Sequence, residues 1–152
     1  MKKILIFALI FSALMCSCTR SVVADRQAGT DVEIFPDYRD VVVPPNIAPL
    51  NFHITEGADA KAAVKVEHGG RSVLIGAKDG RITFGRRQWR SMMTPGNVIT
   101  FTVFIKNGGE WIGYNPFTIT VAPDEVDPYI AFRLIPPGYT MWKEMSICQR
   151  NL

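Results

Sequence analysis

The chain has 152 residues, with 17 Lys and Arg against 14 Asp and Glu. Two of the lysines, Lys2 and Lys3, lie in a segment that we expect to be removed, which leaves 15 basic and 14 acidic side chains and a net charge of +1. This charge excludes the broad basic surface on which nucleic-acid binding depends. The densest basic spot, Arg86-Arg87 with Arg90, is expected to be a solvated face. About 135 mature residues suffice for one domain with a core and exclude a second full domain.

The N-terminus has the pattern of a bacterial lipoprotein signal. Two lysines precede an apolar run of about 12 residues, Ile4 to Met15, which is too short for a permanent membrane span and typical of a cleavable export signal. Ser17 supplies the small residue that lipoprotein signal peptidases require before the cysteine that receives the lipid. We therefore predict a signal peptide at residues 1–17, a lipid on Cys18 and a tether at residues 18–30. An ordinary secretory signal cut nearby is the alternative, and either signal exports the chain.

The predicted lipid would place the protein in the cell envelope, at the outer membrane facing the periplasm. Cys16 leaves with the signal and Cys18 carries the lipid, so Cys148 is the one thiol left over. No intramolecular disulfide is then available, and stability must come from packing. We expect Cys148 to be a buried, inert thiol, with cross-linking to a partner as the alternative.

Residues 31–122 predict an all-β domain, an immunoglobulin-like antiparallel β-sandwich. Short β-branched and aromatic runs, broken by Gly, Pro and Asn, recur about every ten residues. The clearest run is residues 97–105, in which every second side chain from Ile99 to Ile105 is apolar and must face the core. We expect about seven or eight strands in all, drawn from this run and from residues 32–35, 41–43, 50–54, 63–67, 72–77, 81–84, 111–114 and 117–121.

Turn residues predict which strands are neighbours. Asp79-Gly80 lies between two β runs, and both residues tolerate positive φ, so strands 72–77 and 81–84 are expected to pair as a hairpin. Asn107-Gly108-Gly109 predicts a second hairpin after the long strand. Helical periodicity is confined to residues 86–93, which we expect to form one or two turns packed under the sheets.

Prolines mark two segments that do not fit the strand pattern. Residues 43–49 contain three prolines and cannot form a central strand, so a stiff connector is expected, with a peptide-binding polyproline segment as the alternative. Residues 123–152 are expected to be an irregular connector toward another domain. The final part, residues 139–152, is apolar without a strand or helix period, which predicts an interface segment that lacks its partner.

Three of these segments together resemble a known group of proteins. They are PPNIAPLNFHI at residues 44–54, Trp89 before a turn centred on Gly96, and VDPYIAFRLIPPGYTMWKEMSICQRNL at residues 126–152. They resemble the N-terminal region of exported Bacteroidetes lipoproteins with a TolB-like β-propeller, often labelled cytochrome c biosynthesis proteins. The resemblance implies a sandwich domain before a propeller, in a chain that looks truncated. The sequence contains no CxxCH, so haem attachment is carried over to no residue.

The sequence predicts no catalytic residue, metal ligand or cofactor. His53 and His68 are the only histidines, and we expect an outward-facing strand residue and a solvated turn residue rather than general bases. The carboxylates of residues 124–127 lack the spacing of a calcium loop and fit a turn, with a calcium loop as the alternative.

Trp89, Trp111, Tyr114 and Trp142 are the candidate ligand or interface residues. Such rings could stack on sugars, but Trp111 and Tyr114 should lie on opposite faces of one strand, so core or interface packing is preferred. We therefore expect a non-enzymatic, lipid-anchored envelope protein whose sandwich binds or scaffolds protein, either a following propeller or an envelope component. A glycan-binding module is the alternative, and an envelope hydrolase is a more distant one.

The first prediction concerns the lipid anchor. Mass spectrometry of the mature N-terminus should find a lipid-modified Cys18, because Ser17 and the apolar run before it match a lipoprotein signal. Two or more acyl chains there would give stable membrane attachment, whereas one chain binds only marginally. An unmodified N-terminus at any other residue would contradict the prediction.

Overall fold

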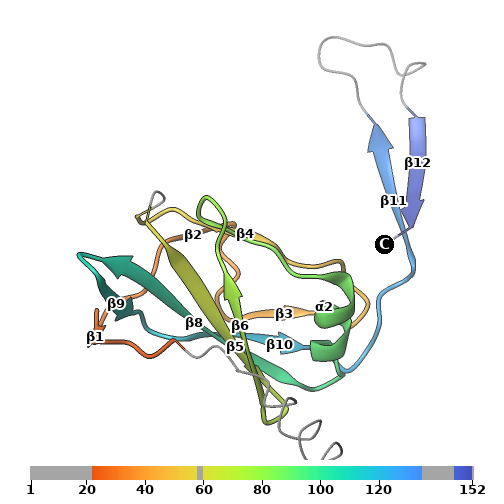
Figure 1. Ribbon diagram of the computed structural model, residues 1–152. Helices are drawn as coiled ribbons and strands as arrows, with labels where there is room; N and C mark the ends of the chain where they lie inside the picture. The colour runs from red at the N-terminus through yellow and green to blue at the C-terminus, as the bar shows by residue number, and fades with distance from the viewer. Residues whose placement is uncertain (1–21, 58–59, 135–145, 152) are drawn as a thin grey trace, which may run out of the picture.

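The computed structural model describes residues 22–57, 60–134 and 146–151, and these ranges form twelve strands and one helix (Figure 1). The chain is mostly β, which confirms the all-β, sandwich-like fold with one short helix that the sequence predicts. The elements are β1 (Arg26–Gln27), β2 (Ile34–Phe35), β3 (Val41–Val43), β4 (Phe52–Ile54), β5 (Ala62–His68), β6 (Arg71–Gly76), β7 (Arg81–Ile82), α2 (Arg86–Met92), β8 (Val98–Asn107), β9 (Glu110–Gly113), β10 (Phe117–Val121), β11 (Tyr129–Leu134) and β12 (Ser146–Asn151).

The larger sheet is organised around β8. This strand pairs antiparallel with β5 on one side, and on the other side with β10 near its start and β9 near its end. The outer strands then add to these: β6 to β5, β3 to β10 and β1 to β9. The last two pairs are parallel, so the predicted antiparallel pattern holds for the central strands and is wrong for β3, while β1 is a strand that the sequence did not predict.

The core lies between this sheet and a three-stranded antiparallel sheet of β2, β4 and β7. Every second side chain of β8 from Ile99 to Ile105 is at most 4% exposed, as the alternation predicts. From the facing sheet, the ring of Phe52 packs edge-on against those of Phe101 and Phe117, with centroids 6.4 and 6.0 Å apart. Removal of this apolar surface from water is the main force that holds the two sheets together.

Helix α2 closes one end of the core. Trp89 and Met92 are buried, and the Trp89 ring lies 5.2 Å from that of Phe84 between ring centroids. The indole Nε1–H of Trp89 donates a hydrogen bond of 3.0 Å to the carbonyl of Ile47. Because Ile47 belongs to residues 44–49, here called the proline segment, this bond links the segment to the core and fits the predicted connector.

The pairing predicted across Asp79-Gly80 is wrong, although the turn itself is present. Both residues have positive φ, 50° and 70°, and Lys78 and Arg81 form a β-bridge around them. Beyond the turn, however, β6 stays with β5 while β7 pairs with β4 in the other sheet. Strand β6 forms its hairpin with β5 instead, and Gly69-Gly70 makes the tight turn between these two strands. The Asp79-Gly80 turn therefore carries the chain between the sheets.

Two segments predicted to lie outside the strands contain strands. In the predicted tether, β1 joins the sheet edge, where the amides of Asp25 and Ala28 donate to the carbonyls of Trp111 and Gly113 at 2.8 Å. In the predicted irregular connector, β11 and β12 form an antiparallel hairpin. A two-residue strand is held by backbone hydrogen bonds and is too short to show a side-chain period, which is why the sequence pattern missed β1.

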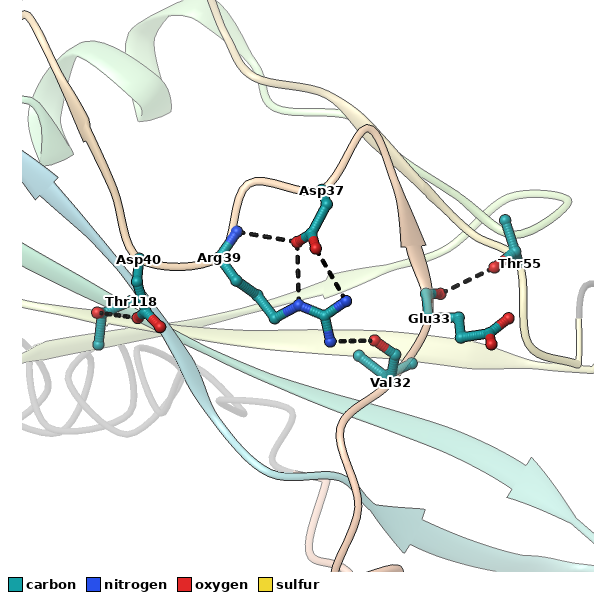
Figure 2. Close-up of polar contacts among 7 residues, drawn as sticks. All are labelled: Val32, Glu33, Asp37, Arg39, Asp40, Thr55 and Thr118. Carbon is teal, nitrogen blue, oxygen red and sulfur yellow. Dashed lines mark hydrogen bonds and ion pairs between the residues drawn. The ribbon is translucent and has the colours of Figure 1, made fainter.

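The crossover from β2 to β3 is fixed by polar contacts around Arg39 (Figure 2). Its Nε donates to the carboxylate of Asp37 at 2.9 Å, and its Nη1 donates to the carbonyl of Val32 at 3.0 Å. The hydrogen bonds from Arg39 hold the pKa of Asp37 below its ordinary value. At the end of the crossover, Asp40 has φ 55° and accepts a hydrogen bond from the Thr118 hydroxyl at 2.9 Å. The Asp37–Arg39 pair is exposed and contributes at most about 1 kcal/mol.

The second prediction compares two glycines of nearly equal φ. Gly80 (φ +70°) and Gly70 (φ +73°) would each strain an alanine, at about 1–2 kcal/mol. A Cβ at Gly80 would also lie 2.9 Å from the His53 ring and from the Ile54 carbonyl, whereas one at Gly70 meets nothing within 4 Å. Gly80→Ala should therefore lower the free energy of unfolding by about 1–3 kcal/mol more than Gly70→Ala in urea denaturation. Equal losses would show that Gly80 does not pack against the His53 ring.

Candidate interaction site at the C-terminal hairpin

The hairpin of β11 and β12 exposes a concentration of apolar side chains. Figure 1 shows it projecting from the end of the sandwich at which α2 lies. Five of the ten exposed large apolar residues among the described positions belong to it. They are Tyr129 (52% exposed), Ile130 (49%), Phe132 (43%), Leu134 (55%) and Ile147 (83%). The hairpin is therefore the first place to look for a contact surface.

The register of the hairpin gathers apolar side chains on one face. Directly paired residues of antiparallel strands share a face, and successive residues alternate. Ile130, Phe132 and Leu134 therefore lie on one face, together with their directly paired residues Arg150, Cys148 and Ser146. We call Ile130, Phe132, Leu134 and Cys148 the apolar face. An isolated two-stranded ribbon is marginally stable in water, so such a face normally packs against something else.

The connector before the hairpin is fixed to the sandwich at two points. The amide of Ala122 donates to the carbonyl of Val43 at 2.8 Å, where β10 ends beside β3. Four residues later, the Asn46 side chain donates through Nδ2 to the Val126 carbonyl at 2.8 Å and accepts from the Val126 amide at 3.2 Å. The side-chain amide of Asn46 thus bonds the backbone of Val126 as a neighbouring strand would. These bonds hold the base of the hairpin in place.

A cleft of about 650 Å³ lies at the base of the hairpin. One wall is the proline segment, and another is α2, which presents Arg86 and Arg90. Glu125 and Pro128 of the connector and Arg150 and Asn151 of β12 also line the cleft. We call this the arginine cleft. It brings together residues that are more than 100 positions apart in the chain.

Two of the predicted aromatic site residues belong to the core instead. Trp89 is 1% exposed, and Tyr114 is 7% exposed with its hydroxyl donating to Glu56 at 2.8 Å. Burial, and secondarily the bond to Glu56, raises the pKa of Tyr114 to about 12. Trp111 is half-buried on β9, with the Lys106 ammonium 5.9 Å from its ring centroid. Trp142 lies outside the described residues, as does Cys18.

The remaining candidate residues lie apart from one another. His53 is half-buried and its Nε2 lies 3.0 Å from the carbonyl oxygen of Asp79, while His68 ends β5 at the Gly69-Gly70 turn. Cys148 is partly exposed on β12, so the prediction of a buried thiol is wrong; a two-stranded ribbon has no second layer to cover it. Within the described residues, no group of three His, Cys, Asp or Glu is placed to hold a metal ion.

Comparisons of the chain with protein-family models, with curated proteins and with solved structures found no match. The resemblance to exported propeller lipoproteins therefore remains a prediction. In the part of the chain with described structure, no helix has both the length and the apolar character needed to span a bilayer.

Sequence reasoning missed three features of this site. The alternation of Ile130, Phe132 and Leu134 is a strand signal, but the prolines that follow it favour an irregular segment. Asn46 and Arg150 gave no local signal, because their roles depend on contacts with residues far away in the chain.

The third prediction concerns the Asn46 clamp. Asn46→Ala removes both hydrogen bonds to Val126, so hydrogen exchange at the Val126 amide should accelerate by roughly tenfold or more, with the sandwich amides unchanged. Asn115→Ala is the matched control, since it removes an exposed amide bond to Asp31 elsewhere on the surface. Exchange at Val126 that is the same in both variants would show that Asn46 does not hold the connector.

Proposed function

We propose that the protein is a lipid-anchored component of the cell envelope whose non-catalytic β-sandwich binds another protein through the C-terminal hairpin. The observation that carries the proposal is the apolar face, in which Ile130, Phe132 and Leu134 are 43–55% exposed on a ribbon that no second layer covers among the described residues. A protein surface can cover such a face with apolar contacts and can also pair with the open strand edges.

The location and the kind of partner rest on the sequence. The signal pattern of residues 1–17 and the lipid expected on Cys18 support an anchor at the outer membrane, with the sandwich facing the periplasm. The resemblance of residues 126–152 supports a propeller, either following in the same chain or in an envelope assembly, as the partner. The role of the sandwich is then to hold that partner near the membrane.

Glycan binding is the second candidate. The observation that favours it is a cleft of about 430 Å³ lined by Tyr114, Glu56, Lys106 and Asn107, which offers hydrogen-bonding groups beside an aromatic ring. It is less favoured because the Tyr114 ring is buried and its hydroxyl already donates to Glu56. A glycan array separates the two functions: selective binding that Glu56→Ala abolishes would support the glycan module.

The fourth prediction tests protein binding at the apolar face. A photoreactive p-benzoylphenylalanine in place of Phe132, in cells that produce the full chain, should cross-link to one defined protein, which mass spectrometry identifies. The matched control is the same residue in place of Val98, an apolar side chain that is 49% exposed on the sandwich. The proposal requires the adduct at position 132 and none at position 98.

A double substitution, read out with the probe at another position of the hairpin, tests the same contact without a probe at position 132. Phe132→Ser combined with Ile130→Ser should remove an adduct formed from position 134, which lies on the same face of the hairpin, because the apolar contact is lost. No adduct from any hairpin position, or equal adducts at positions 132 and 98, would contradict protein binding by this face.

A further inference from the structure

The arginine cleft is lined by three arginines, and their positive charge exceeds the negative charge of the described lining residues. Arg86 and Arg90 lie one turn apart on α2, which places them on the same side of the helix, and Arg150 comes from β12. Glu125 is the one carboxylate among the described lining residues. The two ion pairs of the described residues involve other arginine and lysine side chains, so none of these three arginines has a carboxylate within salt-bridge distance there.

A neighbour on the same helix shows that this is more than a charged surface. Arg87 is also exposed, yet it does not line the cleft, whereas Arg86 and Arg90 do. Positive charges that line the same cleft repel one another, and an anion that binds between them relieves this repulsion. The lining therefore favours a ligand with negative charge.

The geometry of guanidinium groups favours a phosphate among anions. Each guanidinium presents a planar fork of N–H donors, and a carboxylate can satisfy about one fork with its two oxygens. A phosphate monoester has three terminal oxygens and a charge between about −1.5 and −2 at neutral pH, which suits three forks. The cleft of about 650 Å³ is much larger than a phosphate ion, and the proline segment and Pro128 line it with apolar surface. An organic group on the ester would occupy that part.

We propose that the arginine cleft binds a soluble organic phosphate monoester. Arg86, Arg90 and Arg150 hold the phosphate, and the proline segment packs against the organic group. The proposal rests on the cleft and does not require protein binding by the apolar face, although Arg150 pairs with Ile130 and lies on the same face of the hairpin.

The fifth prediction uses phenyl phosphate as the probe, titrated calorimetrically into the full chain in a neutral detergent at low salt. Binding should be saturable, and phenol, which lacks the charge, should give none. Arg86→Ala, Arg90→Ala and Arg150→Ala should each weaken binding by roughly tenfold or more, because each removes charged hydrogen bonds. Arg87→Ala is the matched control and should change the dissociation constant by less than about twofold, the size of a screened surface charge effect.

Three outcomes would overturn the proposal. The first is no saturable binding of phenyl phosphate at millimolar concentration. The second is an equal loss in Arg87→Ala and Arg90→Ala, which would show only general attraction to a basic helix. The third is displacement of phenyl phosphate by vesicles of phosphatidylcholine with phosphatidic acid, which would assign the site to a lipid head group instead of a soluble ester. Thermal melts of each variant confirm that the fold is unchanged, and a loss of binding counts only in variants that melt as the parent does.

Discussion

The pairing of β8 with three other strands is the constraint on which the rest of the structure depends. Its ten residues are long enough for β5 to run along one edge while β10 and β9 share the other. The same strand buries its apolar side chains from Ile99 to Ile105 against the facing sheet. A slip of one residue in β8 would expose that face and break three registers at once, so register and core are fixed together.

Features that depend on local chemistry could be predicted from the sequence. The alternation along β8, the bounds of β3 and β10, the short helix and the positive φ at Asp79-Gly80 all follow from nearby residues. Strand pairing could not be predicted in the same way. Both Asp79-Gly80 and Gly69-Gly70 make tight turns, and only the rest of the sandwich decides that β7 leaves for β4 whereas β6 stays with β5.

The candidate site was harder to predict than the fold, for a related reason. Aromatic residues are the candidate ligand or interface residues that the sequence offers. A large ring also fills a core well, however, and Trp89 and Tyr114 are both buried. The sequence pattern predicted a solvated helix face at Arg86 and Arg90, since the residue that completes their cleft, Arg150, lies about 60 positions later in the chain. A binding surface assembled from distant segments leaves little trace in any one of them.

The proline segment explains how an otherwise unsupported hairpin can serve as a binding element. Trp89 links this segment to the core, and its Asn46 in turn holds Val126 of the connector. Prolines restrict φ, so the segment loses little further freedom when it carries these contacts. The base of the hairpin is therefore ordered before any partner arrives. A partner that covers the apolar face then has to order fewer residues, and more of the free energy of the apolar contact remains as affinity.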